Sequence, residues 1–263
     1  MSTLIDLIFF SEKRKNLLVQ LASGPMHIDE IKDTLNVKAC AVMPQIKKLK
    51  DMDLIVQKGS AYELSDIGEV IVEKMLPLNT LLDVFDGNKD YWSKHDRSPI
   101  PKHLIQKMDM LGKCTLDEPD LDHLFEFPKH LEDRLYSSKT LKSFYSYFCP
   151  DCPSIQAKCA KDGAEVHLIL EEKIYNRLKN DFEDEYNTCL NNKISLYIYS
   201  GKLRMSSFMV TDSFLMLKLF GKDEEFDHRK IMSFTPSALE WGNELAQYYM
   251  DHSVKIRHNS IIQ

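Results

Sequence analysis

The order of local signals in the first 76 residues constrains the fold of this chain more than any other feature. Ser11 is placed to cap a helix that Gly24-Pro25 stops, because serine accepts from the free N–H groups of a first turn and Gly-Pro cannot continue a helix. A second helix is expected over 28–35, where apolar residues recur at helical spacing, and a third over 38–53. Asn36-Val37 alone separates these two helices, so they are joined by a tight turn.

A β-hairpin and a fourth helix follow. Two short runs rich in strand-forming residues, 54–56 and 61–64, flank the turn signal Gly59-Ser60. Ser65-Asp66 then caps a helix that starts near Gly68. Helix, helix, tight turn, helix, hairpin, helix is the order of a winged helix-turn-helix domain, and we predict one for residues 1–76.

The fourth helix continues as an apolar stripe from Val70 to Phe85. Pro77 interrupts it, and we expect this proline to kink the helix or to begin a second one. A stripe this apolar needs a cover. Packing against the next domain of the same chain and a dimer interface are both consistent with it, and we expect a homodimer.

The remainder of the chain changes pattern twice. Residues 77–140 are dense in Pro, Asp, His and Lys, which predicts a helical connector with a possible role in dimerisation. Strands and helices alternate over 141–263 and predict an α/β sheet domain that acts as a sensor. The fold class is therefore α+β: an N-terminal winged helix-turn-helix, a helical connector and a C-terminal α/β sheet domain. The strands are expected over 141–148, 165–170, 194–199, 205–210 and 214–220, and the helices over 154–161, over 173–190 and from a Thr235 cap followed by Pro236.

Composition excludes some classes of protein. The 34 basic residues stand against 40 acidic ones, a net charge of −6, which argues against a protein that coats nucleic acid without regard to sequence. No window holds 18 apolar residues, so we expect no membrane span. Residues 1–10 lack the basic start and the cleavage site of a signal peptide, and we expect a cytoplasmic protein.

The third helix would be the recognition helix of the winged domain, which enters the major groove of double-stranded DNA with its exposed face. Glutamine hydrogen-bonds base edges and lysine holds phosphates. Residues 38–58 hold five lysines against two aspartates, a local charge of +3. A winged helix used for protein contacts without DNA is the alternative. The expected DNA contacts are Lys38, Cys40, Met43, Gln45, Lys47 and Lys48 on the helix, and Lys58, Ser60 and Tyr62 on the hairpin.

Three of the six cysteines, Cys149, Cys152 and Cys159, fall within eleven positions. Cys149-Pro-Asp-Cys152 stands between an expected strand and an expected helix, as the dithiol of a thioredoxin-like enzyme does. With Cys159, and with His167 or Cys189 as the fourth ligand, the same residues are a possible Zn²⁺ site. Packing thiols, a redox or metal sensor and a catalytic dithiol all remain open.

The two tryptophans and many tyrosines of the chain suggest a pocket for an unknown small-molecule effector. Trp92, Tyr147, Asp212 and Trp241 are its candidate residues, although aromatic side chains more often pack in a core. No phosphate-binding glycine loop is present, and no nucleophile-elbow glycines surround Ser207. We therefore expect a protein that is not an enzyme.

Several segments carry a resemblance to a known family. They are Leu35-Asn36-Val37, 44–50, 62–68, Asn88-Lys89-Asp90-Tyr91-Trp92 with His95-Asp96 and Ile100-Pro101, 210–215, and 238–245 with Tyr248-Tyr249. In these segments the chain resembles archaeal transcriptional regulators that join a winged helix to a C-terminal domain of the methanogenesis filament-regulator type. It departs from that pattern over 149–159, where a His-Pro segment is more typical, and this leaves a redox or metal input open.

The resemblance implies sequence-specific DNA binding as a dimer, with a C-terminal domain that senses a signal. We therefore expect a dimeric transcriptional regulator whose C-terminal domain senses an unknown ligand or a redox or metal signal. A thiol-disulfide oxidoreductase using Cys149 and Cys152 is one alternative, and a protein-interaction module without DNA binding is the other. Operator sequence, effector and the sign of regulation are not contained in the sequence.

Overall fold

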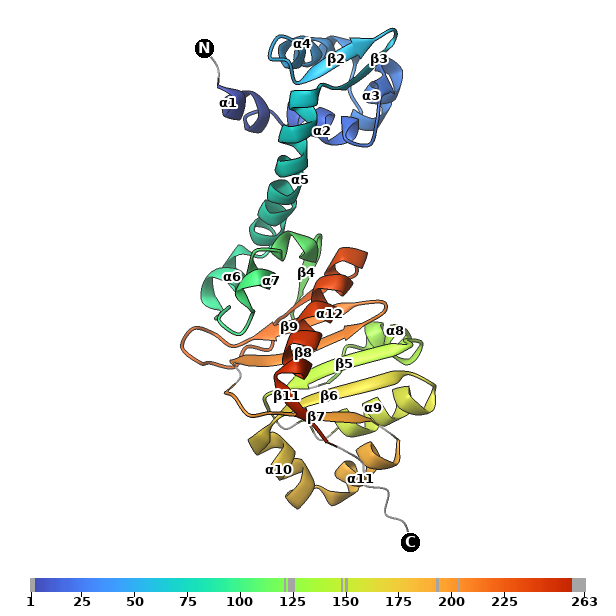
Figure 1. Cartoon of the computed structure of the whole chain (residues 1–263), viewed down its shortest axis with the longest axis vertical. Coiled ribbons are helices and arrows are strands. Elements are labelled where there is room, and N and C mark those ends of the chain that lie inside the picture. Colours follow the sequence, from blue (N-terminus) through green and yellow to red (C-terminus); the bar gives the residue numbers. More distant parts are fainter. Residues whose placement is uncertain are drawn as a thin grey trace. The chain divides into compact units, whose positions relative to one another are not determined.

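The computed structural model describes residues 3–120, 122, 126–147, 149, 151–192, 194–202 and 204–256 (Figure 1). The chain divides into two compact units, Met1–Asn79 and Thr80–Gln263. Unit 1 has one hydrophobic core, and unit 2 has two, one on each face of its sheet. We refer to them as unit 1 and unit 2.

Helices form most of unit 1, and their ends follow from the local sequence. Ser11 Oγ accepts a hydrogen bond from Arg14 N and begins α2, as expected from the sequence. Asn36 adopts a left-handed conformation with φ 49° and ends α3, because asparagine tolerates that region better than most residues. Leu17, Leu18 and Ile46 pack between these helices in the core. The helices are α1 (Leu4–Phe9), α2 (Glu12–Leu21), α3 (Ile28–Leu35), α4 (Ala39–Lys50) and the start of α5 (Asp66–Asp86).

The expected hairpin is present and is extended by a third strand. β2 (Ile55–Lys58) and β3 (Ala61–Leu64) pair antiparallel around Gly59, whose φ is 61°. β1 (Met26–His27) pairs with the other edge of β3. Two residues are too few to show strand alternation, so β1 could not be predicted from the sequence. Helices α2, α3 and α4 with this sheet and α5 form the predicted winged helix-turn-helix.

The expectation that Pro77 might begin a second helix was wrong, because α5 runs from Asp66 to Asp86 through it. Proline removes one hydrogen bond from a helix, but packing supports the helix on both sides of this position. Val72 and Met75 lie in the core of unit 1, and Val84 lies in a core of unit 2. Gly68 fits the first turn because a Cβ there would lie 2.0 Å from the carbonyl oxygen of Leu54.

An eight-stranded mixed sheet is the centre of unit 2 (Figure 1). Its order is β11-β7-β6-β5-β8-β9-β10-β4. β5, β6 and β7 run parallel, and the other neighbours are antiparallel. The strands are β4 (Cys114–Asp117), β5 (Thr140–Tyr145), β6 (Glu165–Glu171), β7 (Ser195–Tyr199), β8 (Met205–Thr211), β9 (Leu215–Leu219), β10 (Lys230–Ser233) and β11 (Ser253–Lys255).

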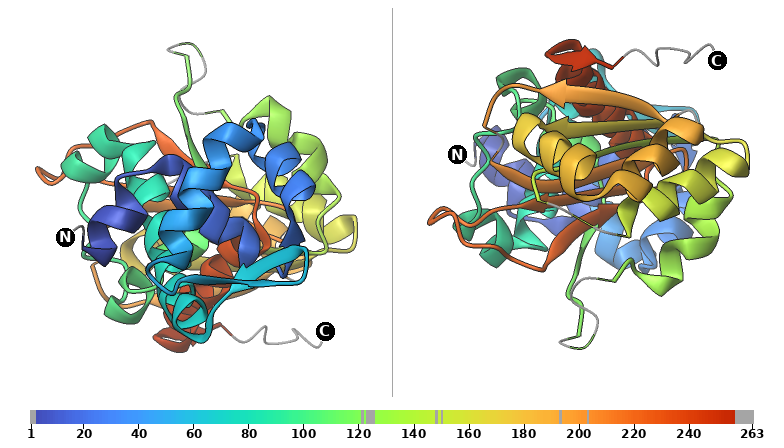
Figure 2. Two further views of the ribbon diagram at one scale, coloured as in Figure 1. Left: turned by 90° about the horizontal axis from the view of Figure 1, so that it is seen from above. Right: turned by 90° about the horizontal axis from the view of Figure 1, so that it is seen from below.

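Helices cover both faces of this sheet. α12 (Pro236–Asp251) lies on one face, where Trp241 packs in one core with Phe144 and Phe208. α9 (Cys152–Lys161), α10 (Glu172–Asp181) and α11 (Glu183–Asn191) lie on the other, over a second core with Leu141 and Leu168 (Figure 2). Because neighbouring residues of a strand point to opposite faces, the strands β5 to β10 supply both cores. Thr235 caps α12 through Oγ1, and Pro236 is its first residue, as predicted.

The predicted connector, residues 77–140, is not a separate unit, and the boundary falls at residues 79 and 80. Its short elements are α6 (Lys89–Lys94), α7 (Lys102–Ile105), η1 (Met108–Leu111), β4, η3 (Lys129–Leu131) and α8 (Glu132–Tyr136). β4 pairs with β10 at the sheet edge, and Tyr91, Leu104 and Met108 are buried in the core under α12. This burial and strand pairing make the segment part of unit 2.

Three further details differ from the sequence expectation. The helix expected over 173–190 is broken at Phe182, whose φ of −138° is not helical, into α10 and α11. The strands β10 and β11 were not expected, because they are short and lack alternation. The strand expected over 141–148 ends at Tyr145, and Phe148 lies outside the described residues. Among the described helices, none combines the length and apolarity needed to cross a bilayer.

Candidate functional site

The exposed face of α4 is the first candidate site. Val42, Ile46 and Leu49 are buried against unit 1, which sets the rotation of the helix about its axis. The opposite face, as predicted, carries exposed side chains. These are Lys38 at the N-cap, Cys40, Met43, Lys47 and Lys48.

Gln45 is half-buried, unlike its exposed neighbours on α4. Its Oε1 accepts a hydrogen bond of 2.8 Å from Arg14 Nη1 on α2. The same guanidinium donates through Nε to the carbonyl oxygen of Leu7. Arg14 therefore ties α4 to α1 and α2, and it fixes the carboxamide of Gln45 at the edge of the exposed face.

The hairpin places two of its three predicted residues on the surface. Lys58 and Ser60 are exposed around Gly59. Lys58 forms an ion pair with Glu63, and this contact raises the pKa of the lysine. The expectation that Tyr62 is exposed for DNA contact was wrong. Only 6% of its surface is exposed, because alternation along β3 turns its side chain into the core of unit 1. Tyr62 is therefore no longer a candidate DNA contact.

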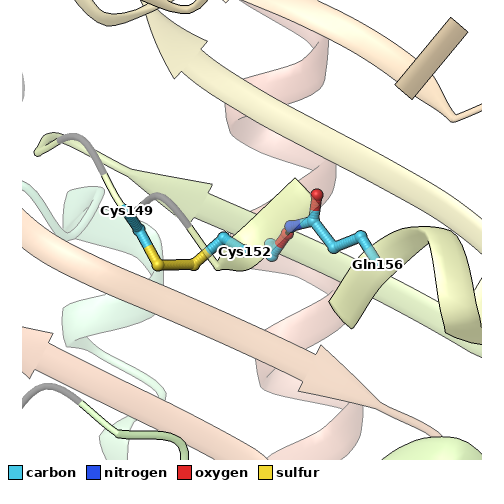
Figure 3. Close-up of a disulfide and its surroundings, with 4 residues drawn as sticks. Cys149, Cys152 and Gln156 are labelled. Carbon is cyan, nitrogen blue, oxygen red and sulfur yellow. Dashed lines mark hydrogen bonds between the residues drawn. A yellow bond between two sulfur atoms is a disulfide. The ribbon is translucent and has the colours of Figure 1, made fainter. Parts of the chain in front are cut away.

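The cysteine cluster does not form the predicted metal site. Cys149 and Cys152 are joined in a disulfide at the start of α9, one turn before Gln156 (Figure 3). Cys159 is buried, with its Sγ 3.9 Å from the carbonyl oxygen of Leu135, and burial raises its pKa to about 11. Two sulfurs shared in a disulfide cannot act as thiolate ligands, so these residues do not fit Zn²⁺.

The two residues considered as a fourth ligand are engaged elsewhere. Cys189 is fully buried, and burial raises its pKa to about 12. His167 contacts Glu165 through Nε2 and Tyr197 Oη through Nδ1, at 3.0 and 3.3 Å. Within the described part of the chain, no group of three or more His, Cys, Asp or Glu is arranged to hold a metal ion.

A cavity of about 270 Å³ in unit 2 is the second candidate site. It lies over the face of the sheet that α9 covers and at the end of β5. β5, β8, β9 and β10 form its floor, and the start of α9, η3 and α8 form its walls. The residues of the floor are Tyr145, Ser207, Met209, Met216, Lys218 and Lys230, and those of the walls include Phe127, Lys129, Glu132, Tyr136, Tyr147, Cys149, Asp151, Cys152 and Ile155.

Two buried lysines distinguish the floor of this cavity. Lys218 on β9 and Lys230 on β10 each expose only 6% of their surface. Lys230 Nζ forms an ion pair of 2.9 Å with Asp117. Lys218 Nζ lies 4.6 Å from the ring centroid of Phe226. Burial and the charge of Lys230 lower the pKa of Lys218 to about 8, against a smaller opposite effect of Asp227.

The residues predicted to line an effector pocket are not brought together. Trp92 and Trp241 are core residues whose indole N–H groups donate to the carbonyl oxygens of Val84 and Leu104. Asp212 is exposed, and its carboxylate accepts from Lys139 N at 3.2 Å. Of the four, only Tyr147 lines the cavity.

Comparisons with known proteins identify the family. Residues 3–86 match the model of the N-terminal domain of methanogenesis regulatory protein FilR1. Residues 124–252 match the model of the middle domain of the same protein. The chain belongs to the FilR1 family.

One curated relative in this family is the methanogenesis regulatory protein FilR1 of Methanothrix harundinacea (strain 6Ac). It is 25% identical over 258 residues, and the alignment covers 92% of this chain and 56% of the relative. The chain thus spans about half the length of that protein. The FilR1 middle-domain match contains every residue that lines the cavity.

Two solved structures are similar to the chain at low scores. One is TrmBL2, an archaeal chromatin protein, with a TM-score of 0.43 and 12% identity, covering 96% of this chain and 97% of that one. The other is Nuc, a phospholipase D family member from Salmonella typhimurium, with a TM-score of 0.40 and 16% identity, covering 55% of this chain and 99% of that one.

Sequence reasoning missed Lys218 and Lys230, although one signal was present. Leu215-Met216-Leu217-Lys218-Leu219 is an apolar run with one lysine, inside a segment that was predicted to be a strand. A lysine in a strand whose two faces are both covered has no route to bulk water. Such a residue marks a cavity or a partner charge, and here it marks the cavity of unit 2.

Replacing Lys218 with methionine is expected to stabilise unit 2. At pH 7 the ammonium is charged in the folded chain, so the full cost of burying it is present. Between about pH 8 and the unfolded pKa of 10.5 the unfolded chain binds more protons, so the wild type gains stability as pH rises. Lys218→Met should therefore exceed the wild type by roughly 1–2 kcal/mol at pH 7, with the margin shrinking towards pH 10.

Urea denaturation at pH 7 and at pH 10 measures this effect. Lys222→Met, which removes an exposed lysine from the loop after β9, is the matched control and should change little. A Lys218→Met variant that is less stable than the wild type at pH 7, or a difference independent of pH, contradicts the account of Lys218 as a buried, uncompensated charge.

Proposed function

We propose that this chain is a sequence-specific DNA-binding transcription regulator in which unit 1 contacts DNA and unit 2 senses a small molecule. The observation that carries the proposal is the division of α4, which is buried along Val42, Ile46 and Leu49 and exposed along its lysines. A helix with one face in the core and a basic, uncovered face suits the major groove. The relative in the same family is named a regulatory protein, which agrees with this role.

Each exposed side chain has a part in the proposed complex. Lys38, Lys47 and Lys48 hold phosphates, as expected of ammonium groups on a groove-facing helix. Met43, with 43% of its surface exposed, and Cys40 offer apolar contact to a thymine methyl group. Gln45 presents its carboxamide nitrogen to a base edge while Arg14 holds its oxygen. On the hairpin, Lys58 and Ser60 contact the backbone beside the groove.

Replacing Lys47 and Lys48 together with alanine should weaken DNA binding by about tenfold or more at moderate salt. Two fewer phosphate contacts also release fewer counterions, so the slope of log K against log salt should fall by about two. Footprinting on the upstream region of the chain's own gene finds a site, and fluorescence anisotropy on that site then measures affinity across a salt series.

The double variant Lys161→Ala/Lys179→Ala is the matched control, because it removes the same charge from exposed lysines of unit 2. It should bind DNA as the wild type does. Unchanged affinity and unchanged salt slope in the Lys47/Lys48 variant would refute the groove assignment. If the wild type itself binds no DNA, the alternative of a protein-interaction module is favoured instead.

The thiol-disulfide oxidoreductase remains the alternative that one observation favours, since the Cys149–Cys152 disulfide lines the cavity. Reduction of a small disulfide that is lost in Cys149→Ser would support it. A regulator keeps its DNA affinity in that variant, so anisotropy with Cys149→Ser separates the two functions.

A homodimer through α5 is the second part of the proposal. Within unit 1, Ile67, Val70 and Leu78 lie along one side of this helix and are 55%, 64% and 44% exposed. Lys74, one helical turn from both Val70 and Leu78, lies on the same side, so this stripe has three exposed apolar side chains and one lysine. A second copy of the chain would cover this stripe and set the distance between two recognition helices. Because α5 contributes residues to cores of both units, we propose that it carries the signal from unit 2 to unit 1.

A glutamate at the centre of this stripe should dissociate the dimer. Val70→Glu introduces a charge that an apolar interface cannot solvate, so sedimentation equilibrium should give the monomer mass where the wild type gives twice that mass. Ser23→Glu adds the same charge at an exposed position whose neighbours Ala22 and Gly24 lie beside the opposite face of α5, and it should remain dimeric. A monomeric wild type, or a dimeric Val70→Glu variant, rejects this interface.

A further inference from the structure

A row of polar side chains crosses the sheet of unit 2 on the cavity side. Tyr145 on β5 pairs with Ser207 on β8, and Ser207 pairs with Lys218 on β9. The register between β9 and β10, in which Leu217 faces Ile231, places Lys218 next to Lys230. Lys230 in turn pairs with Asp117 on β4. Five strands thus contribute one polar residue each, and four of the five line the cavity.

The neighbouring row on the same face is apolar. Met209 on β8 pairs with Met216 on β9, and Met216 pairs with Met232 on β10. Met209 and Met216 line the cavity beside the two lysines. The floor therefore has two halves, one that is cationic and one that is apolar and deformable.

The charges of the cationic half do not balance. Asp117 at the end of the row pairs with Lys230. Among the described residues, no carboxylate forms an ion pair with Lys218, and its ammonium contacts only the ring of Phe226. Like charges side by side on adjacent strands repel each other, and a buried cation without a partner is costly. An anion in the cavity removes both costs at once.

The acidic residues around the cavity do not neutralise this floor. Glu126 and Asp151 are exposed, and Glu132 is half-buried. They lie on the walls, together with the exposed Lys129. Solvated charges at a rim are screened by water and salt, whereas the buried lysines are screened little. The exposed Asp151 therefore offsets the charge of the two buried lysines only weakly.

Two further features favour an anion with an apolar body. α9 begins at the cavity with Asp151 as its N-cap, and the Asp151 side chain forms no capping hydrogen bond. The positive end of the helix dipole therefore faces the cavity. The walls bring Tyr136, Tyr147 and Phe127 to the space above the floor. The volume lies near the lower end of small-molecule pockets, roughly 300–1,000 Å³, which limits the ligand to a small one.

We propose that this cavity binds a small organic oxyanion, a carboxylate or a phosphate ester with a flat apolar body, whose anionic group is held between Lys218 and Lys230. The apolar body lies against Met209 and Met216, under the tyrosines of the walls. That this ligand is the signal of the regulator rests on the proposed function. Binding itself rests on the cavity alone.

The test uses the full chain at constant ionic strength with four probes: benzoate, phenyl phosphate, and their neutral counterparts benzamide and phenol. Calorimetric titration gives the dissociation constants, and thermal unfolding reports the same binding as a rise in Tm. At least one of the two anions should bind with a dissociation constant of about 1 mM or lower, and at least tenfold more tightly than its neutral counterpart.

Variants locate the bound anion. Lys218→Met and Lys230→Met should each lose binding by at least tenfold, and Lys222→Met should bind as the wild type does. Lys218→Met is expected to remain folded because it removes a buried charge, so its loss of binding is not a loss of structure. Benzoate binding without phenyl phosphate binding assigns a carboxylate, and phenyl phosphate binding without benzoate binding assigns a phosphate ester.

Three results would overturn the proposal: equal binding of the neutral counterparts, unchanged binding by Lys218→Met, or no binding of either anion at about 10 mM, well above that dissociation constant. The DNA affinity of the same Lys218→Met variant distinguishes a wrong anion site from a wrong proposed function. A regulator without an anion site keeps its DNA binding, whereas a chain that is not a regulator shows none in any variant.

Discussion

Burial of one sheet on both faces is the constraint on which unit 2 depends. α12 covers one face and α9, α10 and α11 cover the other, so a strand in the middle of the sheet has no face in water. Strands in that position are expected to be apolar throughout. β9 obeys this rule at four of its five residues and departs from it at Lys218. The cavity lies over this lysine, at a place where no described helix packs directly on that side of the strand.

Unit 1 follows a different rule, because its helices are small and each has one face in water. Burial of Val42, Ile46 and Leu49 determines which side of α4 remains exposed, and Arg14 fixes its position against α1 and α2. The net charge of −6 and the basic face of α4 are therefore compatible. An acidic chain with one local basic face should bind non-specific DNA weakly and dissociate from it readily. Its affinity for its operator should therefore depend on base contacts.

Sequence alone was sufficient where the signals are local. Ser11, Asn36 and Gly59 each act on their own turn, and the order of such local signals predicted the winged domain. It failed where distant residues decide. Whether 114–117 is a loop or a strand depends on β10, more than a hundred residues away. The zinc alternative does not fit the structure, because Cys149 and Cys152 form a disulfide and Cys159 is turned into the core by α9.

The candidate sites show the same division. Helical periodicity placed the lysines of α4 on the surface, and strand alternation, had it been applied to β3, would have placed Tyr62 in the core. The cavity was beyond reach, because the row from Tyr145 to Lys230 exists only through the register of four strands. Trp92 and Trp241 were proposed as pocket residues only because they are aromatic. Aromatic side chains most often pack in the core, and these two do so.

Direct titration of Lys218 by NMR tests the central claim, that this lysine is a buried cation that forms no ion pair with any carboxylate of the described residues. The full chain is labelled with ¹³C-lysine, and the Lys218 resonance is assigned by its loss in Lys218→Met. The account predicts a pKa of about 8 in the free protein, which rises when an anion occupies the cavity. A pKa near the ordinary value of about 10.4 for lysine, unaffected by any probe, would show that water or another group already compensates the charge and would contradict the account.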